Sequence, residues 1–298
     1  MQTLTLTDGL AEVVIAPALG AGLVGYEFIR GDRHEPLFRR CRSVATATPF
    51  DLACNLLVPW SNRISGGGFR FRGRFHALEP NLAGEPLPIH GNGFSSEWEV
   101  AGASGLSAAL TLDSQGPGLY KYAAEVRYTL DTGALKVGFK VINRGPFALP
   151  FGLGLHPWFP RTQDTTLRAR ATNLSLEGPF HLPADQVPVS EREDWNFSRA
   201  RRLPPGWINN EFSGWDGRAE IVWADRGLRL QVDTEGNPNL NAYIVYSPSE
   251  NASFFCFEPV THLIDAHNRP GGPTTHGLVV LHKGEELAVD CRFSPDLA

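Results

Sequence analysis

The sequence predicts an all-β protein folded as a large antiparallel β-sandwich. Apolar and polar residues alternate with a period of two along most of the chain, while helical periodicity is nearly absent. The 298 residues include 31 glycines and 23 prolines, which follow no repeat. Helix interiors tolerate both residues poorly, whereas a chain that turns often needs them. Alternation and composition therefore both indicate many short strands.

The alternating segments come in groups, and turn-forming residues separate their members. The predicted strands are residues 3–7 with 11–15, then 106–112, 123–130 and 135–142 as a meander, then 219–224 with 228–232, and 278–281 with 287–293. Segment 190–202 is polar on all sides, so we expect a loop or at most a short helix there. No composition shift or linker interrupts the chain, which predicts one domain over residues 1–298.

The charges nearly balance, with 27 basic against 32 acidic residues and a formal net charge of -5. A nucleic-acid partner is therefore not expected, because such proteins usually carry a basic excess. No stretch approaches the roughly 20 apolar residues of a membrane span, and the N-terminus lacks the features of a secretory signal. Four widely spaced cysteines without a CxxC pair are typical of reduced thiols. We expect a cytoplasmic monomer or homodimer.

Three segments depart from plain alternation and combine polar residues with aromatics and glycines. In the first, Asn62 and Arg63 stand between an aromatic-rich run and three glycines, and His90 is bracketed by turn formers. A semi-buried arginine needs acceptors for its donors, which either a ligand or a structural ion pair can supply. The glycine run at 66–68 is not followed by the lysine and hydroxyl pair of a phosphate-binding loop, so we do not interpret it as a nucleotide site.

The second and third segments each place one titratable residue among aromatics. His156 precedes a proline and then Trp158, a ring suited to cover the apolar face of a sugar; a core histidine bonded to a backbone carbonyl is the alternative. Glu258 directly follows an apolar strand and precedes a proline. A carboxyl partly desolvated by phenylalanines would have a raised pKa suited to proton transfer. The alternative is an exposed glutamate at a strand end.

Metal and cofactor signals are weak. Five polar residues near the C-terminus could in principle ligate a metal, but their spacing fits no common zinc pattern: His262, Asp265, His267, His276 and His282. No GxGxxG or GxSxG motif occurs. We therefore expect neither a metal nor a cofactor.

The order of the motifs resembles the aldose 1-epimerase (galactose mutarotase) family: Asn62-Arg63-Ile64, Ile89-His90-Gly91, His156-Pro157-Trp158-Phe159 and Phe257-Glu258-Pro259. This resemblance implies a β-sandwich of the galactose mutarotase-like type. It also implies interconversion of the α and β anomers of free sugars without a cofactor, with a monosaccharide as the partner.

The resemblance carries roles onto individual residues. Glu258 would be the base that takes the proton of the C1 hydroxyl, and His156, as a histidinium, the acid that protonates the ring oxygen. Arg63 and His90 would bind sugar oxygens. Asn62, Trp158 and Asn209 complete the expected sugar-binding set. Asn209 is a departure, because many family members have an aspartate in this position. Glu211 and Asp216 are the two candidates to supply the missing carboxylate.

Three other functions remain open on the sequence. A hexose 6-phosphate 1-epimerase would need cations at the mouth of the site, which Arg70, Arg72 and Arg74 could supply unless they form a solvated strand face. A non-catalytic sugar-binding protein could use the same scaffold, since fold does not determine function. A metal-dependent barrel enzyme is the third.

Overall fold

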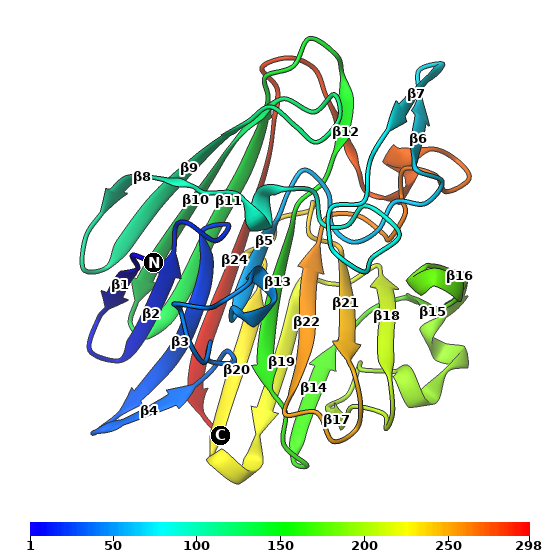
Figure 1. Cartoon of the computed structure of the whole chain (residues 1–298). Helices are drawn as coiled ribbons and strands as arrows, with labels where there is room; N and C mark the ends of the chain where they lie inside the picture. Colours follow the sequence, from blue (N-terminus) through cyan, green and yellow to red (C-terminus); the bar gives the residue numbers. More distant parts are fainter.

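The computed structural model describes residues 1–298 and consists of two large antiparallel sheets packed face to face (Figure 1). The first sheet has eleven strands, and Figure 1 shows β13, β22, β21 and β18 side by side in it. Its strand order is β1 (Leu4–Thr7), β2 (Ala11–Ala16), β3 (Gly22–Arg30), β5 (Cys54–Leu57), β13 (Gly154–Pro160), β22 (Phe254–Val260), β21 (Ala242–Ser247), β18 (Ile208–Ser213), β15 (Asn173–Glu177) and β16 (Pro183–Pro188), with β4 (Arg33–Pro36) paired to β3.

The second sheet has nine strands. Its order is β17 (Arg201–Arg202), β14 (Thr165–Ala169), β19 (Arg218–Trp223), β20 (Leu228–Asp233), β24 (Glu286–Leu297), β11 (Ala134–Asn143), β10 (Tyr122–Asp131), β9 (Ser107–Ser114) and β8 (Glu99–Ala103). Two small ladders pair β12 (Leu149–Phe151) with β23 (Val279–Leu281) and β6 (Gly68–Phe71) with β7 (Arg74–Ala77). The helical turns are all short 3₁₀ segments: Pro49–Asp51, Gly93–Ser95, Pro179–His181, Val189–Glu191, Glu193–Trp195, Ala224–Arg226 and Pro273–His276.

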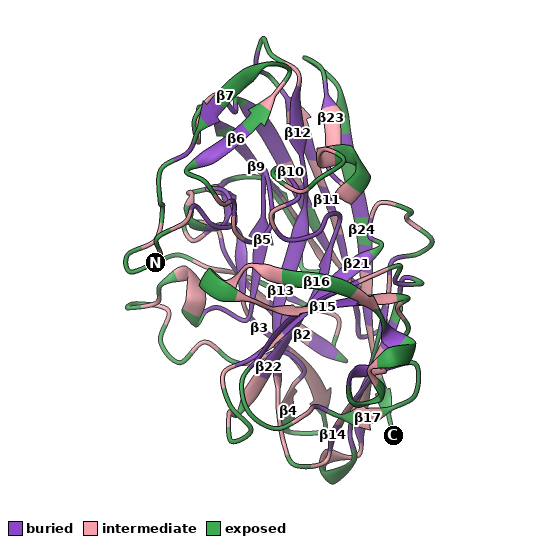
Figure 2. Ribbon diagram, turned by 90° about the vertical axis from the view of Figure 1, so that its right-hand side faces the viewer, coloured by how far each residue is buried: buried purple, intermediate pink, exposed green.

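One hydrophobic cluster of 62 buried residues fills the space between the two sheets. Figure 2 shows the facing strands largely buried, with the exposed residues gathered in loops and on outer strands such as β16. Tyr26 of β3 connects the layers, since its hydroxyl donates to the carbonyl of Gly133 at 2.7 Å and accepts from the amide of Leu135 at 3.2 Å. A buried phenol needs such partners, so this contact also fixes how the sheets are aligned.

The structure confirms the all-β antiparallel fold. The meander of β9, β10 and β11 begins and ends within two residues of the predicted strands, and the predicted pairs of β1 with β2 and of β19 with β20 are present. Segment 190–202 contains only short 3₁₀ turns before β17. None of the helical segments has the length and apolarity that a membrane crossing requires. All four cysteines are free, and three of them are buried.

One predicted strand pair was wrong. Segments 278–281 and 287–293 are both strands, but they do not pair with each other: β23 pairs with β12, whereas β24 lies between β11 and β20. The turn between them is held from outside, because the amide of Gly284 donates to the carbonyl of Asn143. The turn therefore connects β23 of the small ladder with β24 of the second sheet.

Candidate active site

A cavity of about 170 Å³ opens on the face of the first sheet that points away from the core. All seven residues predicted from the sequence line it: Asn62, Arg63, His90, His156, Trp158, Asn209 and Glu258. They come from segments up to about two hundred positions apart in the sequence, and the fold brings these side chains together around one cavity.

Strand alternation explains why β13 and β22 supply the central pair. On β13, Leu155 and Phe159 belong to the core cluster, so the residues between them face the opposite side of the sheet. The same holds on β22, where Phe255 and Phe257 are core residues and Glu258 faces the cavity. The two strands are hydrogen-bonded neighbours. His156 and Glu258 are therefore placed against each other by backbone pairing.

The His156–Glu258 pair is buried and close. Nε2 of His156 lies 3.3 Å from Oε1 of Glu258, with side-chain exposures of 8% and 2%. Burial raises the pKa of Glu258 to about 8, and the charge of Arg63 opposes this rise. Burial lowers the pKa of His156 to about 3. Oε2 of Glu258 has no hydrogen-bond partner in the protein.

The raised pKa expected for Glu258 is present, but the expected histidinium is not. In the unliganded protein near neutral pH, Glu258 holds the proton and His156 is neutral, since desolvation disfavours the charged form of each group. Glu258–H beside neutral His156 carries as many protons as ionised Glu258 beside a histidinium. The pair can therefore exchange these two states by moving one proton over a short distance.

A pair of reciprocal hydrogen bonds holds His90. The amide of Asn62 donates to Nδ1 of His90 at 3.0 Å, and the amide of His90 donates back to the carbonyl of Asn62 at 3.0 Å. Since Nδ1 accepts, the proton of the neutral ring lies on Nε2, which makes Nε2–H a donor. Burial lowers the pKa of His90 well below its usual value, so the ring stays neutral. His90 can offer a sugar oxygen a hydrogen bond without a charge.

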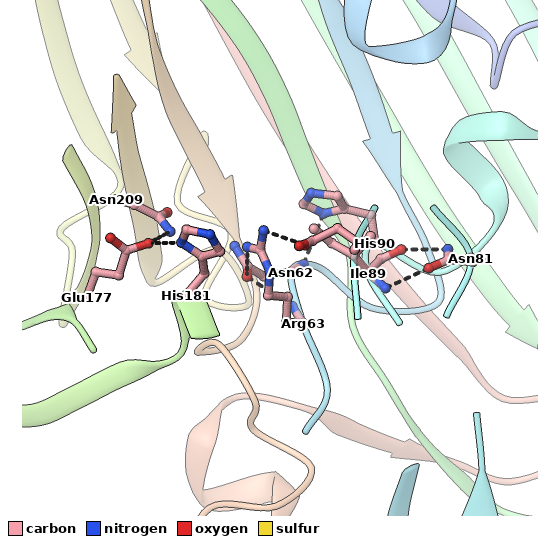
Figure 3. Close-up of polar contacts among 9 residues, drawn as sticks. Asn62, Arg63, Asn81, Ile89, His90, Glu177, His181 and Asn209 are labelled. Carbon is pink, nitrogen blue, oxygen red and sulfur yellow. Dashed lines mark hydrogen bonds and ion pairs between the residues drawn. The ribbon is translucent and has the colours of Figure 1, made fainter. Parts of the chain in front are cut away.

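Hydrogen bonds to Asn81 hold the turn that carries His90. Asn81 donates to the carbonyls of Ile89 and Gly91 at 2.7 and 2.6 Å, and its Oδ1 accepts from the amide of Ile89 (Figure 3). His90 has φ 60° and Gly91 has φ 66°. A Cβ on Gly91 would lie 2.1 Å from the carbonyl oxygen of Val58, so only glycine fits there.

We expect Gly91→Ala to lower the free energy of unfolding by at least about 3 kcal/mol, because a backbone atom blocks the added methyl. Gly84→Ala is the matched control, since Gly84 also has positive φ but nothing lies within 4 Å of its added Cβ. It should cost only about 1 kcal/mol. Urea unfolding of both variants measures the difference, and equal losses would show that the close contact has no effect.

Arg63 does not face the cavity as a free cation. Its Nη2 lies 2.5 Å from Oε2 of Glu85, and the two side chains are 14% and 15% exposed. Oδ1 of Asn62 accepts from the amide of Arg63. Figure 3 shows Arg63 beside Asn62. The sequence left open whether Arg63 serves a ligand or a structural ion pair; it makes the ion pair and lines the cavity as well.

Trp158 forms the aromatic wall behind the central pair. Its ring stacks on His156 with centroids 5.0 Å apart, and the guanidinium of Arg39 lies 3.9 Å over the indole. Arg39 is itself held by the carbonyls of Phe50 and Leu52. This stack keeps the indole fixed and places a positive charge behind His156, which adds to the lowering of its pKa.

The sequence also matches a known protein family. The model of the family described as aldose 1-epimerase matches residues 2–294. The chain belongs to the aldose 1-epimerase family. The uncharacterised protein YphB of Escherichia coli K12 is 33% identical over 259 residues, covering 84% of this chain and 85% of that protein.

Solved structures agree with this membership. An Escherichia coli K12 protein, provisionally described as an aldose 1-epimerase, has a TM-score of 0.90 at 29% identity and covers 100% of this chain and 99% of that chain. A GalM/aldose epimerase homologue from C. elegans has a TM-score of 0.84 at 14% identity, covering 100% and 99%, which shows the shared fold alone. The predicted resemblance and the galactose mutarotase-like fold are thereby confirmed.

Asn209 is the position at which the chain departs from many aldose 1-epimerases, and the structure shows which carboxylate stands beside it. Glu211 is not that residue, because it is 2% exposed and paired with Arg269 at 2.7 Å outside the cavity. Asp216 lies in a separate hollow on the second sheet. Nδ2 of Asn209 instead donates to Oε1 of Glu177 at 2.7 Å. Neither suggested replacement lines the cavity, and the carboxylate that bonds Asn209 is that of Glu177, which also lies outside the cavity wall.

The arginines considered for a phosphate lie elsewhere. Arg70 and Arg72 are exposed on the β6–β7 hairpin and Arg74 follows them, and none lines the cavity. Their guanidinium groups lie over the rings of Phe75, Phe71 and Phe147, in that order. They form a solvated strand face, which was the simpler of the two interpretations.

One group of side chains at the site could hold a metal ion: the ligand atoms of His156, Cys256 and Glu258 lie within 4.8 Å of one another. A divalent ion there would replace the proton on Glu258 and the one on Cys256. The C-terminal histidines are engaged differently. His262 accepts from the amide of Ser61 and bonds the carbonyl of Leu263, and His267 contacts the hydroxyl of Tyr120.

Sequence reasoning missed several residues of the cavity wall. They lie in loops or on strands without a motif: Phe50, Leu82, Glu85, His181, Trp207 and Tyr246. Glu85 sits next to Gly84 in a turn, and His181 lies in a 3₁₀ turn after β15. The spacing of residues around these positions does not distinguish them from ordinary surface loops. The exception is Trp207, because an isolated tryptophan directly before a strand could have indicated a binding residue.

Proposed function

We propose that this chain is an aldose 1-epimerase that interconverts the α and β anomers of free, uncharged aldohexoses. One observation carries the proposal: Glu258 is buried in a sugar-sized cavity, with one oxygen 3.3 Å from His156 and the other unpartnered. Buried polar atoms are nearly always hydrogen-bonded, so an unpartnered carboxyl oxygen facing a cavity suggests a ligand hydroxyl. The family supports an epimerase in general, and the site supports this particular reaction.

The proposed reaction uses the proton that His156 and Glu258 share. When a sugar binds, the proton passes from Glu258 to His156. Ionised Glu258 then takes the proton of the C1 hydroxyl while His156 protonates the ring oxygen, and the bond between C1 and the ring oxygen breaks. Rotation about C1–C2 exposes the other face of the aldehyde, and the reverse transfers close the ring. Each assisted transfer contributes roughly 10²- to 10⁴-fold.

The other residues bind and orient the sugar in this proposal. His90 offers Nε2–H to the oxygen that becomes the aldehyde, while Arg63 and Asn62 hold hydroxyl groups. Trp158 covers an apolar face of the ring. Preformed donors in a site that excludes water act more strongly than they would in water. No step requires a cofactor.

The charges of the cavity favour an uncharged sugar over a hexose 6-phosphate. The one guanidinium in the wall belongs to Arg63, and Glu85 already neutralises it. His90 and His156 are held neutral by burial, which lowers both pKa values. A phosphate would need unpaired cations within reach.

Polarimetry of freshly dissolved α-glucose and α-galactose tests the proposal. We expect the protein to accelerate mutarotation of both sugars and to leave the rate for glucose 6-phosphate close to that in buffer. Calorimetry separates the non-catalytic alternative, which predicts saturable sugar binding without any acceleration. A panel of aldoses on which no acceleration occurs would remove the assignment.

A further inference from the structure

Cys256 is a buried thiol at the site that the proposed reaction does not use. It lies on β22 between the core residues Phe255 and Phe257, so strand alternation directs it to the same face of the sheet as Glu258. Its side chain is fully buried and does not line the cavity. A buried free cysteine usually serves as a small apolar residue. A further role must therefore come from its neighbours.

Two potential metal ligands lie next to this thiol. Cys256 is paired across the ladder with Trp158 of β13, and His156 lies two positions from Trp158 on the same face. Nε2 of His156 is 3.3 Å from Oε1 of Glu258, and the ligand atoms of the three residues lie within 4.8 Å of one another. Two hydrogen-bonded strands therefore bring a nitrogen, a sulfur and an oxygen ligand together.

The mixture of ligand atoms indicates which metal would bind. Zn²⁺ takes thiolate, imidazole and carboxylate ligands at about 2.0–2.3 Å in a tetrahedron, so its ligand atoms lie about 3.3–3.8 Å apart. The distance between His156 and Glu258 already has this value, and Sγ of Cys256 has to move by at most about 1.5 Å to match it. Three protein ligands leave the fourth position to water. Mg²⁺ and Ca²⁺ prefer oxygen ligands alone and are not expected here.

The surroundings favour a reversibly bound ion over a permanently held one. Zn²⁺ with a thiolate, a carboxylate and a neutral imidazole has no net charge, which suits a buried position. Two features weaken the binding. The guanidinium of Arg39 lies 3.9 Å over the neighbouring ring of Trp158 and opposes a cation. Nδ1 of His156 has no hydrogen-bond partner in the protein, whereas zinc-ligating histidines almost always bond an acceptor through their second nitrogen.

We propose that His156, Cys256 and Glu258 form a zinc site, and that Zn²⁺ bound there inhibits the protein reversibly. The ion replaces the proton of the thiol and that of the carboxyl, and it occupies Oε1 of Glu258 and Nε2 of His156. Neither group can then move a proton to or from a sugar. The binding of zinc stands on the geometry alone, whereas the inhibition rests on the proposed function.

Cobalt spectroscopy tests the site without measuring activity. Co²⁺ binds the same kinds of ligand as Zn²⁺ and absorbs strongly by charge transfer when a thiolate coordinates it. We expect this absorption in the wild type, its removal by Zn²⁺, and its absence in Cys256→Ser and Cys256→Ala. Cys41→Ser is the matched control and should keep the absorption, since Cys41 is the one cysteine that is not buried. The other candidate metal group contains no thiol: Glu12, Glu27 and His34.

Polarimetry with α-glucose measures the inhibition, and each variant is compared with its own rate in the absence of metal. We expect the Zn²⁺ concentration that halves the rate to rise at least about tenfold in Cys256→Ser and Cys256→Ala, because a ligand is lost. Cys41→Ser should keep the sensitivity of the wild type. A chelator should restore the rate, and Mg²⁺ should have no effect.

A wild type without the thiolate absorption would overturn the zinc site, and so would equal zinc sensitivity in the wild type and both Cys256 variants. Absorption without inhibition would contradict the inhibitory role. If the wild type accelerates no aldose, the proposed function fails, and cobalt spectroscopy alone decides whether the zinc site exists.

Discussion

Glu258→Gln is expected to lower kcat for mutarotation about 10³-fold while KM changes little. Glutamine keeps the size and the hydrogen-bonding capacity of a protonated glutamate, but it cannot give up its proton. Polarimetry over a range of α-glucose concentrations separates kcat from KM. Glu220→Gln, on the second sheet and paired with Arg168 at 3.4 Å, is the control and should keep full activity.

The same variant should unfold at a higher temperature near pH 7. Because burial raises the pKa of Glu258 to about 8, the folded protein keeps a proton there that the unfolded chain releases above its ordinary pKa of 4.5. Ionisation in the unfolded chain therefore weakens folding increasingly as pH rises from 4.5 to 8, and glutamine removes this effect. Lower activity together with higher stability excludes misfolding as the cause. Full activity in Glu258→Gln would contradict the assigned role.

The pH dependence of the reaction follows from the shared proton. Between the pKa of His156, about 3, and that of Glu258, about 8, the pair holds one transferable proton. We expect kcat/KM to be level toward neutral pH and to fall above about pH 8, where this proton is lost. On the acid side, the limit is set by the stability of the fold.

Acid should unfold the protein steeply. Four histidines are buried and have lowered pKa values because of desolvation: His90, His156, His262 and His267. Each stays neutral in the folded protein while the unfolded chain gains a proton below about pH 6.5, so stability falls as pH decreases below that value. Glu258, whose pKa is raised by burial to about 8, opposes this trend between pH 4.5 and 6.5, and Glu211, whose pKa burial also raises, opposes it just above pH 4.5.

The balance of these groups sets the expected size of the effect. Four histidines against Glu258 leave a loss of stability that approaches about 4 kcal/mol for each pH unit once the pH is well below 6.5. Since domains of this kind are stable by only about 5–15 kcal/mol, unfolding should be evident near pH 5. Urea unfolding at pH 7.5, 6.5 and 5.5 measures the slope.

A pair of variants identifies the groups responsible. His267 packs against Phe69 with ring centroids 4.5 Å apart, so His267→Phe should preserve the packing and reduce the slope by about one histidine, or about 1.4 kcal/mol per pH unit. His282 is exposed, and His282→Gln should leave the slope unchanged. A slope that His267→Phe does not alter would contradict this account.

Alternation in the sequence predicted the fold well where strands have one buried face and one solvated face. The meander of β9, β10 and β11 is of this kind, and its bounds were close. Prediction failed for the pairing of β23 and β24, because a turn of three residues looks the same whether it closes a hairpin or connects two sheets. That distinction depends on Asn143, far away in the sequence.

The site was predictable to the extent that its residues interrupt the strand pattern. His90, His156 and Glu258 stand beside glycines or prolines and could be selected for that reason. Their charge states could not, since these follow from complete burial by distant segments. Glu177 was also out of reach, because its importance comes from three donors that meet only in the folded chain.

The position of β24 has a consequence for biosynthesis. The strand lies between β11 and β20, which belong to segments made more than fifty residues earlier. Until residues 286–297 leave the ribosome, the second sheet consists of two separate halves with open edges, and unpaired edges invite association with other chains. During synthesis, the strand edges of β11 and β20 therefore stay unpaired until β24 is made. A chaperone that shields these edges should raise the yield of folded protein.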